Sequence, residues 1–159
     1  MAPLFREISQ VAIKEFSDLH DLSQWTQLLI RLSVAIVLSG ALGYERESRR
    51  SAAGLRTHML VGLGAAIFIL IPLQSGMTII DMSRVLQGLI AGIGFLGAGA
   101  IIKVDKNREV YGLTTAASLW LTAAIGVSAG MGREATAVIS TVLALIILSL
   151  LRRFKGGAR

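Results

Sequence analysis

Five apolar stretches, each about as long as a bilayer is thick, constrain this sequence more than any other feature. A helix rises about 1.5 Å per residue, so it crosses a hydrocarbon core of about 30 Å with roughly 20 apolar residues. The stretches span about 26–44, 57–73, 85–102, 113–131 and 135–151. The sequence therefore predicts an all-α membrane protein whose main domain, residues 25–152, is a bundle of five transmembrane helices.

The composition agrees with a membrane protein and excludes several other classes. Of the 159 residues, 53% are hydrophobic and only 16% are charged, too few for the charged shell of a soluble domain of this size. The basic residues lie beside apolar runs, so the net charge of +6 favours membrane flanks over nucleic-acid binding. Without cysteine the chain has neither a disulfide framework nor a thiolate metal site.

Lysine and arginine alternate between the connections and predict the orientation, because short cytoplasmic loops carry the excess of positive charge. Most of the 16 basic residues lie after the first stretch, after the third and in the tail: Arg46, Arg49, Arg50, Arg56, Lys103, Lys106, Arg108, Arg152, Arg153, Lys155 and Arg159. An odd number of spans places all three clusters on one side. We therefore expect five spans, with the N-terminus periplasmic or extracellular and the C-terminus cytoplasmic.

The two ends of the chain carry patterns of their own. In residues 1–24, apolar residues recur at helical spacing among charged ones, which predicts an amphipathic helix lying at the membrane interface. Trp25 then marks the headgroup level. The alternative is that residues 1–24 are disordered. They lack the basic-then-apolar order of a signal peptide, so we expect no cleavage there. Residues 153–159 form a basic cytoplasmic tail.

Small residues recur along the third and fourth stretches. Because lipid provides no hydrophobic reason for helices to associate, close backbone approach must hold them together, and that requires small side chains. We expect helix packing at Gly88, Gly92, Gly94, Gly97 and Gly99 in the third stretch, and at Thr114, Ser118, Thr122 and Gly126 in the fourth. The glycines lie within an apolar span, so they do not form a phosphate-binding loop.

Charged residues gather at the expected cytoplasmic ends rather than in the middle of the spans. Arg49 and Arg50 have no obvious partner, and the positive-inside rule explains them as anchors of the topology. The rule does not explain Glu45, an acid directly next to a span. We therefore expect a functional polar layer, made of Glu45, Arg46, Arg56, Thr57 and Asp105. The alternative is that the arginines only fix the topology.

Catalytic and metal-binding patterns are missing from the sequence. Neither a Ser/His/Asp spacing nor a zinc motif is present, and the only histidines are His20 and His58. Two acids and one histidine on loops are too few for a dedicated cation cage. We expect a protein that is no enzyme and holds no metal or cofactor. The centres of the spans carry no charge, which disfavours a proton-coupled pump. This does not exclude a pore lined by hydroxyl groups.

Four blocks of sequence resemble the MgtC/SapB family of bacterial inner-membrane proteins. They are "GYERE" at 43–47, "AGLRTHMLVGLGAAIF" at 53–68, "GIGFLGAGAII" at 92–102 and "GLTTAASLWLTAAIGV" at 112–127. The blocks run in register over about residues 27–152. The family's motifs fall on Glu45, Arg46, Gly54, Leu55, Arg56, Thr57, Gly94, Gly97, Gly99, Gly112, Thr114, Thr115 and Trp120.

The resemblance implies a five-span protein of the bacterial inner (plasma) membrane with a cytoplasmic C-terminus. Members are linked to growth in low magnesium and, in pathogens, to survival inside macrophages. The function it implies is regulation of other membrane proteins, such as ATP synthase or transporters. The alternative is a transporter or channel for Mg²⁺ or another cation, and a weaker third option is a module that docks a soluble protein on its basic face. The expected partners are the lipid bilayer and either another membrane protein or a second copy of the chain.

Two departures from the family pattern bear on the virulence role. Virulence-type members carry a soluble C-terminal domain, whereas this sequence stops at Arg159, so we expect a short form. Some members also have a cysteine just after the fourth-span tryptophan, where this sequence has Leu121. Both departures concern the virulence role and leave the expected membrane fold unchanged.

Overall fold

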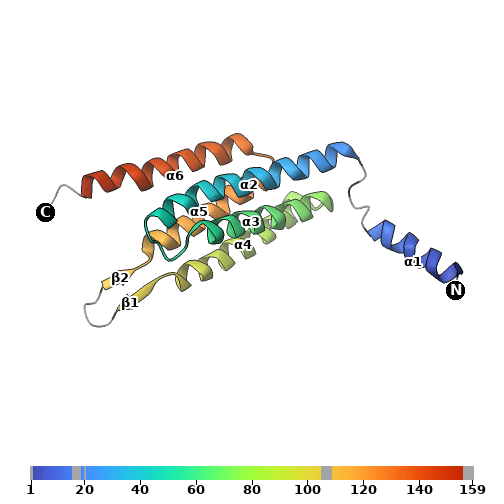
Figure 1. The fold of residues 1–159 in the computed structure, drawn as a ribbon, viewed down its shortest axis with the longest axis horizontal. Coiled ribbons are helices and arrows are strands. Elements are labelled where there is room, and N and C mark those ends of the chain that lie inside the picture. The colour runs from blue at the N-terminus through green and yellow to red at the C-terminus, as the bar shows by residue number, and fades with distance from the viewer. Residues whose placement is uncertain (1, 16–18, 20, 105–108, 156–159) are drawn as a thin grey trace. The chain divides into compact units, whose positions relative to one another are not determined.

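The structure, a computed structural model, describes residues 2–15, 19, 21–104 and 109–155. These residues form six helices: α1 (Ala2–Glu15), α2 (Leu22–Ser48), α3 (Leu55–Gln74), α4 (Ile79–Gly99), α5 (Leu113–Gly130) and α6 (Glu134–Lys155). One antiparallel hairpin of β1 (Ile102–Val104) and β2 (Glu109–Tyr111) joins α4 to α5 (Figure 1). The chain divides into two compact units, Met1–Ile30 and Arg31–Arg159.

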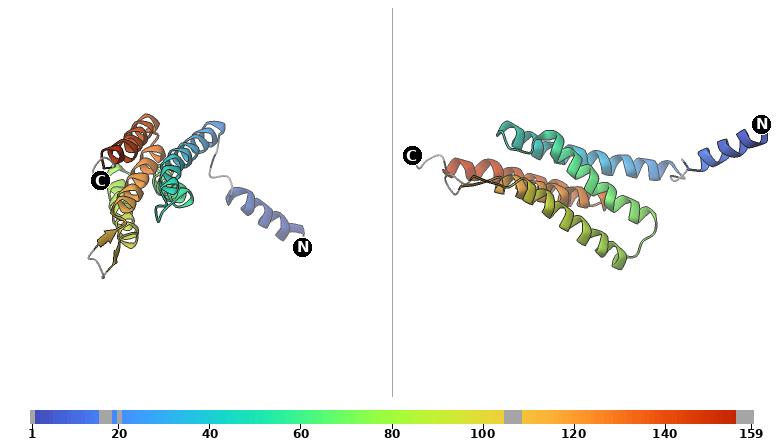
Figure 2. Two further views of the ribbon diagram at one scale, coloured as in Figure 1. Left: turned by 60° about the vertical axis from the view of Figure 1, so that its left-hand side comes forward. Right: turned by 90° about the horizontal axis from the view of Figure 1, so that it is seen from below.

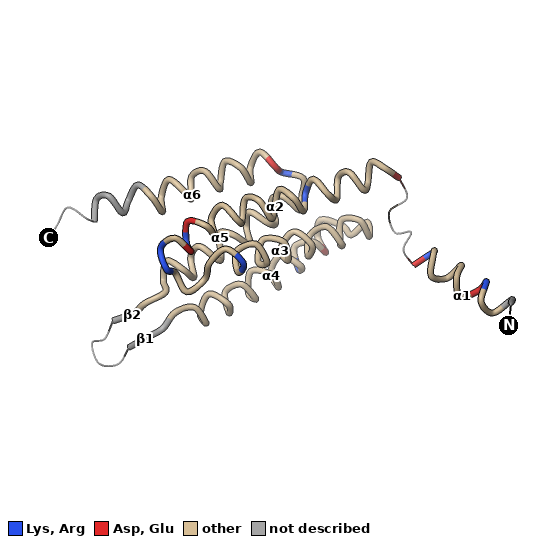
Figure 3. The backbone as a smooth tube through the Cα atoms, in the orientation of Figure 1, with Lys and Arg blue, Asp and Glu red and all other residues tan. Residues whose placement is uncertain are grey.

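Four helices, α2 to α5, are long and apolar enough to cross a membrane, and the apolar part of α6 that the structure describes, Glu134–Ser149, is shorter. The predicted all-α membrane class is confirmed, and an N-terminal helix is present. The fifth crossing and the interfacial position of α1 stay predictions. In the larger unit the helices run alongside one another, and charge gathers near helix ends (Figures 2 and 3).

The hairpin was not expected, and it shortens the third predicted span. Apolar Ile101 and Ile102 extend the stretch read from the sequence to 102, but α4 ends at Gly99 and Ile102 pairs with Tyr111 in the hairpin. α4 instead begins earlier than predicted, at Ile79, because the Thr78 hydroxyl accepts from the Asp81 backbone N–H at 3.2 Å and caps the helix. The span therefore moves toward the N-terminus.

α5 is the central helix of the larger unit and packs against α3, α4 and α6. In its most apolar stretch 50% of the residues are buried, against 11% for α4. Small residues permit the closest approach: a Cβ placed on Gly130 would lie 2.7 Å from the Ala66 carbonyl oxygen of α3. A glycine is also required before α5, where Gly112 adopts a φ of 91° and faces the Ala100 carbonyl oxygen.

The buried core is built largely from alanine. One cluster joins four helices and consists of Ala35, Leu42, Ala66, Ile125, Ala129, Ala137 and Ala144. A second, smaller cluster consists of Ala65, Ile93 and Ala123 and holds α4 against α3 and α5. Alanine in these positions brings backbones close together, as small residues do in membrane helix interfaces generally.

Candidate functional site

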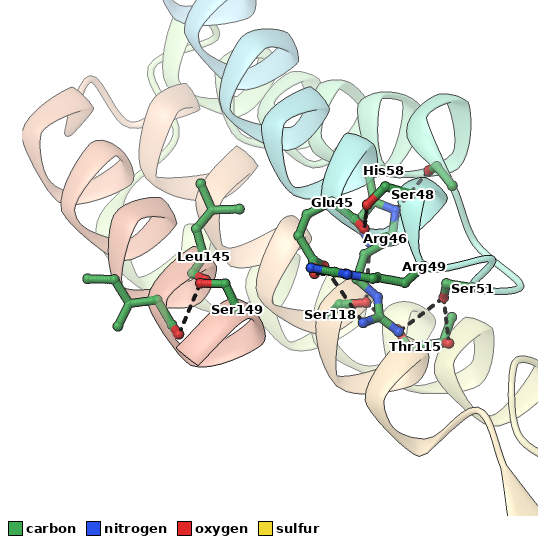
Figure 4. A network of polar contacts seen from close by, with 12 residues as sticks. Glu45, Arg46, Ser48, Arg49, Ser51, His58, Thr115, Ser118, Leu145 and Ser149 are labelled. Atoms are coloured by element: carbon green, nitrogen blue, oxygen red, sulfur yellow. Dashed lines mark hydrogen bonds and ion pairs between the residues drawn. The ribbon is translucent and has the colours of Figure 1, made fainter. Parts of the chain in front are cut away.

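A polar cluster forms where α2 ends, and Glu45 is its centre. Its Oε1 atom accepts a hydrogen bond from Nε of Arg49 at 3.1 Å, and its Oε2 atom lies 3.8 Å from Nη1 of Arg46 (Figure 4). Only 12% of each of the Glu45 and Arg46 side chains is exposed. Arg49 thus pairs with Glu45 one helical turn away, a partner that the sequence reasoning missed.

Hydroxyl groups connect this cluster to α5. Nη2 of Arg46 donates to the Ser51 hydroxyl at 3.2 Å, and that hydroxyl lies 2.8 Å from the Thr115 hydroxyl. Thr115 is buried in the first turn of α5. The chain of contacts therefore ties the end of α2 to the start of α5 across the bundle.

His58 is fully buried beside the same hydroxyls. Its Nδ1 atom lies 2.9 Å from the Gly54 carbonyl oxygen, and its Nε2 atom lies 3.3 Å from the Ser118 hydroxyl. Because a carbonyl oxygen only accepts, Nδ1 carries a proton. The Ser118 hydroxyl also donates to the Thr115 carbonyl oxygen at 2.8 Å, so the imidazole and this hydroxyl share one small network.

Glu47 has a structural role that the sequence reasoning missed. Gly54 precedes α3 and offers no capping side chain, and the Glu47 Oε2 atom accepts from the Leu55 backbone N–H at 2.7 Å instead. A carboxylate is favourable there because the N-terminus of a helix carries a partial positive charge. A Cβ placed on Gly54 would lie 2.7 Å from the same oxygen. The signal in the sequence was a glycine where a capping residue is usual.

The structure brings together part of the predicted polar layer. Glu45 and Arg46 form an ion pair, whereas Arg56 and Thr57 are exposed on the first turn of α3 and make no side-chain hydrogen bond or ion pair with them among the described residues. Asp105 lies outside the described residues. Within the part of the chain that the structure describes, no group of three or more histidine or acidic residues could hold a metal ion.

The predicted packing residues separate into buried and open positions. On α5, Ser118, Thr122 and Gly126 are buried, and Thr114 is exposed while its neighbour Thr115 is buried. On α4, a Cβ placed on Gly97 would lie 3.5 Å from the Ala116 Cβ of α5, which is ordinary contact. Apart from chain neighbours and the backbone of α4 itself, no atom of the described residues lies within 4 Å of a Cβ placed on the remaining glycines of α4: Gly88, Gly92, Gly94 and Gly99.

Three of these open glycines share one side of α4. Gly88, Gly92 and Gly99 follow at spacings of four and seven residues, which places them on one helix face. We call them the open glycine face. A groove of about 490 Å³ runs along its Gly88 and Gly92 part and is lined mainly by apolar residues of α4 together with Phe68 of α3. The face is available to another helix.

Arg31 is a second residue that the sequence reasoning missed. It lies within α2, and its Nη1 atom donates to the Gly130 carbonyl oxygen at 3.3 Å. Gly130 is the last residue of α5, where unpaired carbonyls carry a partial negative charge. The positive charge of Arg31 therefore lies against the partial negative charge of a helix C-terminus rather than against an acidic side chain.

Comparison of the sequence with known proteins identifies its family. The MgtC family model matches residues 32–156. "Protein MgtC" of Brucella abortus (strain 2308) is 45% identical over 122 residues, which are 76% of this chain and 50% of that protein. "Putative magnesium transporter YhiD" of Escherichia coli (strain K12) is 38% identical over 129 residues, 77% of this chain and 59% of that protein.

"Protein SrpB" of Synechococcus elongatus is also similar, with 38% identity over 142 residues, 82% of this chain and 78% of that protein. The chain thus spans little more than half the length of the Brucella and Escherichia coli relatives. No solved structure matches it. With the family model covering nearly all of the larger unit, this multi-pass membrane protein belongs to the MgtC family.

Proposed function

We propose that this protein is a non-enzymatic regulator that binds another membrane protein through α4. The observation that carries the proposal is the open glycine face, Gly88, Gly92 and Gly99, against which no described residue packs. Small residues on a lipid-exposed helix allow a second backbone to approach closely, which is how transmembrane helices associate. α4 is the least buried of the four long apolar helices, so it has room for a partner helix.

The packing of the interior favours a regulator over a carrier. α2, α3 and α5 cross at glycines, and a Cβ placed on Gly62 would already lie 2.7 Å from the Ser39 Cβ. The buried Ser118 and Thr122 hydroxyls donate to backbone carbonyls of α5. A substrate path through this layer requires the helices to separate.

The names of the relatives suggest a role connected with magnesium, and the charge pattern suggests an orientation in the membrane. One relative has the name "Putative magnesium transporter YhiD" and others the name MgtC, so we propose a role in adaptation to low magnesium. We also propose an inner-membrane location with the polar cluster on the cytoplasmic side, supported by the arginines at the end of α2. Reporter fusions at both termini test the orientation, and termini in one compartment contradict it.

Crosslinking in native membranes tests the partner. The full chain is tagged, crosslinked in cells and captured, and the bound membrane proteins are identified by mass spectrometry. Gly92→Leu puts a bulky side chain on the open glycine face, at a position where a Cβ meets no neighbouring helix, so we expect the protein to fold but to lose the partner. ATP synthase and transporters are the partners sought first.

Gly94→Leu is the matched control. Gly94 is equally open, but two residues turn a helix by about 200°, so its side chain leaves the open glycine face clear. We expect the control to keep the partner. Loss in both variants, loss in neither, or recovery of only second copies of the chain contradicts the proposal.

Cation transport is the alternative, and the buried polar groups along α5 support it. Thr115, Ser118 and Thr122 follow at nearly helical spacing beside His58, and all four are buried. Hydroxyls and carbonyls can line a path for cations. Mg²⁺ flux into proteoliposomes that is lost in Ser118→Ala supports transport, and flux no greater than in empty liposomes removes this alternative.

A further inference from the structure

A charged pocket lies at the end of α2, on the side that faces α6. It is lined by Glu45, Arg46, Ser48, Arg49, Arg50 and Leu148, and its volume is about 380 Å³. Three arginines and one glutamate leave a positive surplus in this lining. A concave surface with such a surplus attracts anions.

Two of the arginines have donors available for a ligand. Glu45 occupies only Nε of Arg49, and 37% of the Arg49 side chain remains exposed. Arg50 is exposed and makes no side-chain ion pair or hydrogen bond within the described residues. Guanidinium groups present paired N–H donors that match the oxygens of a phosphate group.

The backbone at Arg50 closes the end of α2. Its φ is 55°, and it is the only residue other than glycine with a positive φ in the described part of the chain. The left-handed region is unfavourable for a residue with a Cβ, and glycine adopts it freely. Here the conformation ends the helix, because the Arg50 and Ser51 backbone N–H groups donate to the Glu47 and Arg46 carbonyl oxygens at 2.9 and 3.1 Å. The arginine stands where glycine is usual, and its side chain lines the pocket.

The pocket lies directly after the first expected membrane span, residues 26–44. α2 has 27 residues, and at 1.5 Å per residue it is about 40 Å long, which exceeds the hydrocarbon core by about 10 Å. Because the expected span ends at residue 44, we place the last turn of α2 in the headgroup layer. Basic pockets between membrane helices at this level bind anionic headgroups. Leu148 of α6 adds an apolar wall suited to the carbon chain next to the phosphate.

We propose that this pocket binds a phosphate group, with an anionic phospholipid as its source. Arg49 and Arg50 donate to the phosphate oxygens, and Glu45 holds Arg49 in place through its Nε atom. Free inorganic phosphate shares this chemistry. The inference does not depend on the partner proposed for α4, because the two surfaces share no lining residue.

Native mass spectrometry of the full chain tests the site. The protein is released from detergent with phosphatidylglycerol, with zwitterionic phosphatidylcholine, or with phosphatidylglycerol plus inorganic phosphate. The parent retains phosphatidylglycerol in preference to phosphatidylcholine. Arg49→Gln and Arg50→Gly each weaken that retention about fivefold, the contribution of one arginine near a charged membrane surface. Arg133→Gln, an exposed arginine on the turn before α6, leaves it unchanged.

Arg50→Gly separates binding from folding. Glycine relieves the positive φ, so the thermal unfolding temperature of this variant equals or exceeds that of the parent while the lipid is lost. Displacement of the lipid by inorganic phosphate identifies any phosphate group as sufficient, and resistance to displacement identifies the lipid as the source. Equal retention of the two lipids, or parental retention in Arg49→Gln and Arg50→Gly, overturns the proposal.

Discussion

Gly126 of α5 lies so close to Gly62 of α3 that a Cβ placed on Gly126 would meet the Gly62 carbonyl oxygen. The same Cβ would lie 3.0 Å from the Ala65 Cβ. Gly62 is equally close to α2, since a Cβ placed on it would lie 2.7 Å from the Cβ of Ser39, which is fully buried. Three helices are thus stacked through one layer of glycine, and this layer sets their spacing.

Gly126→Ala tests whether this layer holds the bundle together. The added methyl meets backbone that cannot yield without moving a helix, so we expect a loss of about 1–3 kcal/mol in the free energy of unfolding. Denaturant unfolding in detergent micelles measures it. Gly92→Ala is the control: its methyl enters open space, so stability is unchanged or slightly raised by the better helix propensity of alanine. Equal losses in the two variants contradict the packing described.

The Glu45–Arg49 pair is suited to a double-mutant cycle. The donor–acceptor distance is 3.1 Å and the residues are four apart on α2, but 37% of Arg49 is exposed and solvent screens the charges. We therefore expect a coupling of about 0.5 kcal/mol between Glu45→Gln and Arg49→Gln in the free energy of unfolding. Additive losses from the two substitutions would show that the pair contributes nothing.

The helices were largely predictable from the sequence because apolar length alone specifies a membrane helix. Predicted spans 57–73 and 113–131 lie within two residues of α3 and α5 at either end. The hairpin was not predictable in the same way, since Ile101 and Ile102 extend the apolar run past the true helix end. Hydropathy records which residues tolerate lipid, and it does not record where the backbone leaves the helix.

The candidate site was predictable only in part. Glu45 was singled out because positive-inside anchoring does not explain an acid directly next to a membrane span. Its spacing of four residues from Arg49 was a signal for an ion pair between them, which the sequence reasoning missed. The glycine rows could not be sorted in the same way. Gly92 and Gly126 stand in similar small-residue patterns, yet one is open and the other is packed, because the pattern does not say which side of a helix faces its neighbour.

Glu47→Ala should weaken the start of α3. The carboxylate is the acceptor for the Leu55 backbone N–H, and loss of a helix cap typically costs about 1 kcal/mol in the free energy of unfolding. Hydrogen exchange of the first amides of α3 detects the fraying directly. Glu47→Gln keeps an acceptor oxygen and should recover most of the protection at Leu55, so equal fraying in both variants would argue against capping.

Arg31 and Gly132 are predicted to be energetically coupled. Arg31→Gln removes the cation at the end of α5, which should cost about 1 kcal/mol in the free energy of unfolding. Gly132→Ala should cost more, because φ is 71° there and the new Cβ would lie 2.7 Å from Nη2 of Arg31. In the double variant the shorter glutamine relieves that overlap and leaves only the backbone strain, so the combined loss is smaller than the sum. Arg133→Gln, one residue beyond Gly132, serves as the control and should show no coupling to Gly132→Ala. Strictly additive losses for Arg31→Gln and Gly132→Ala would mean that the Arg31 guanidinium does not occupy this position in the membrane.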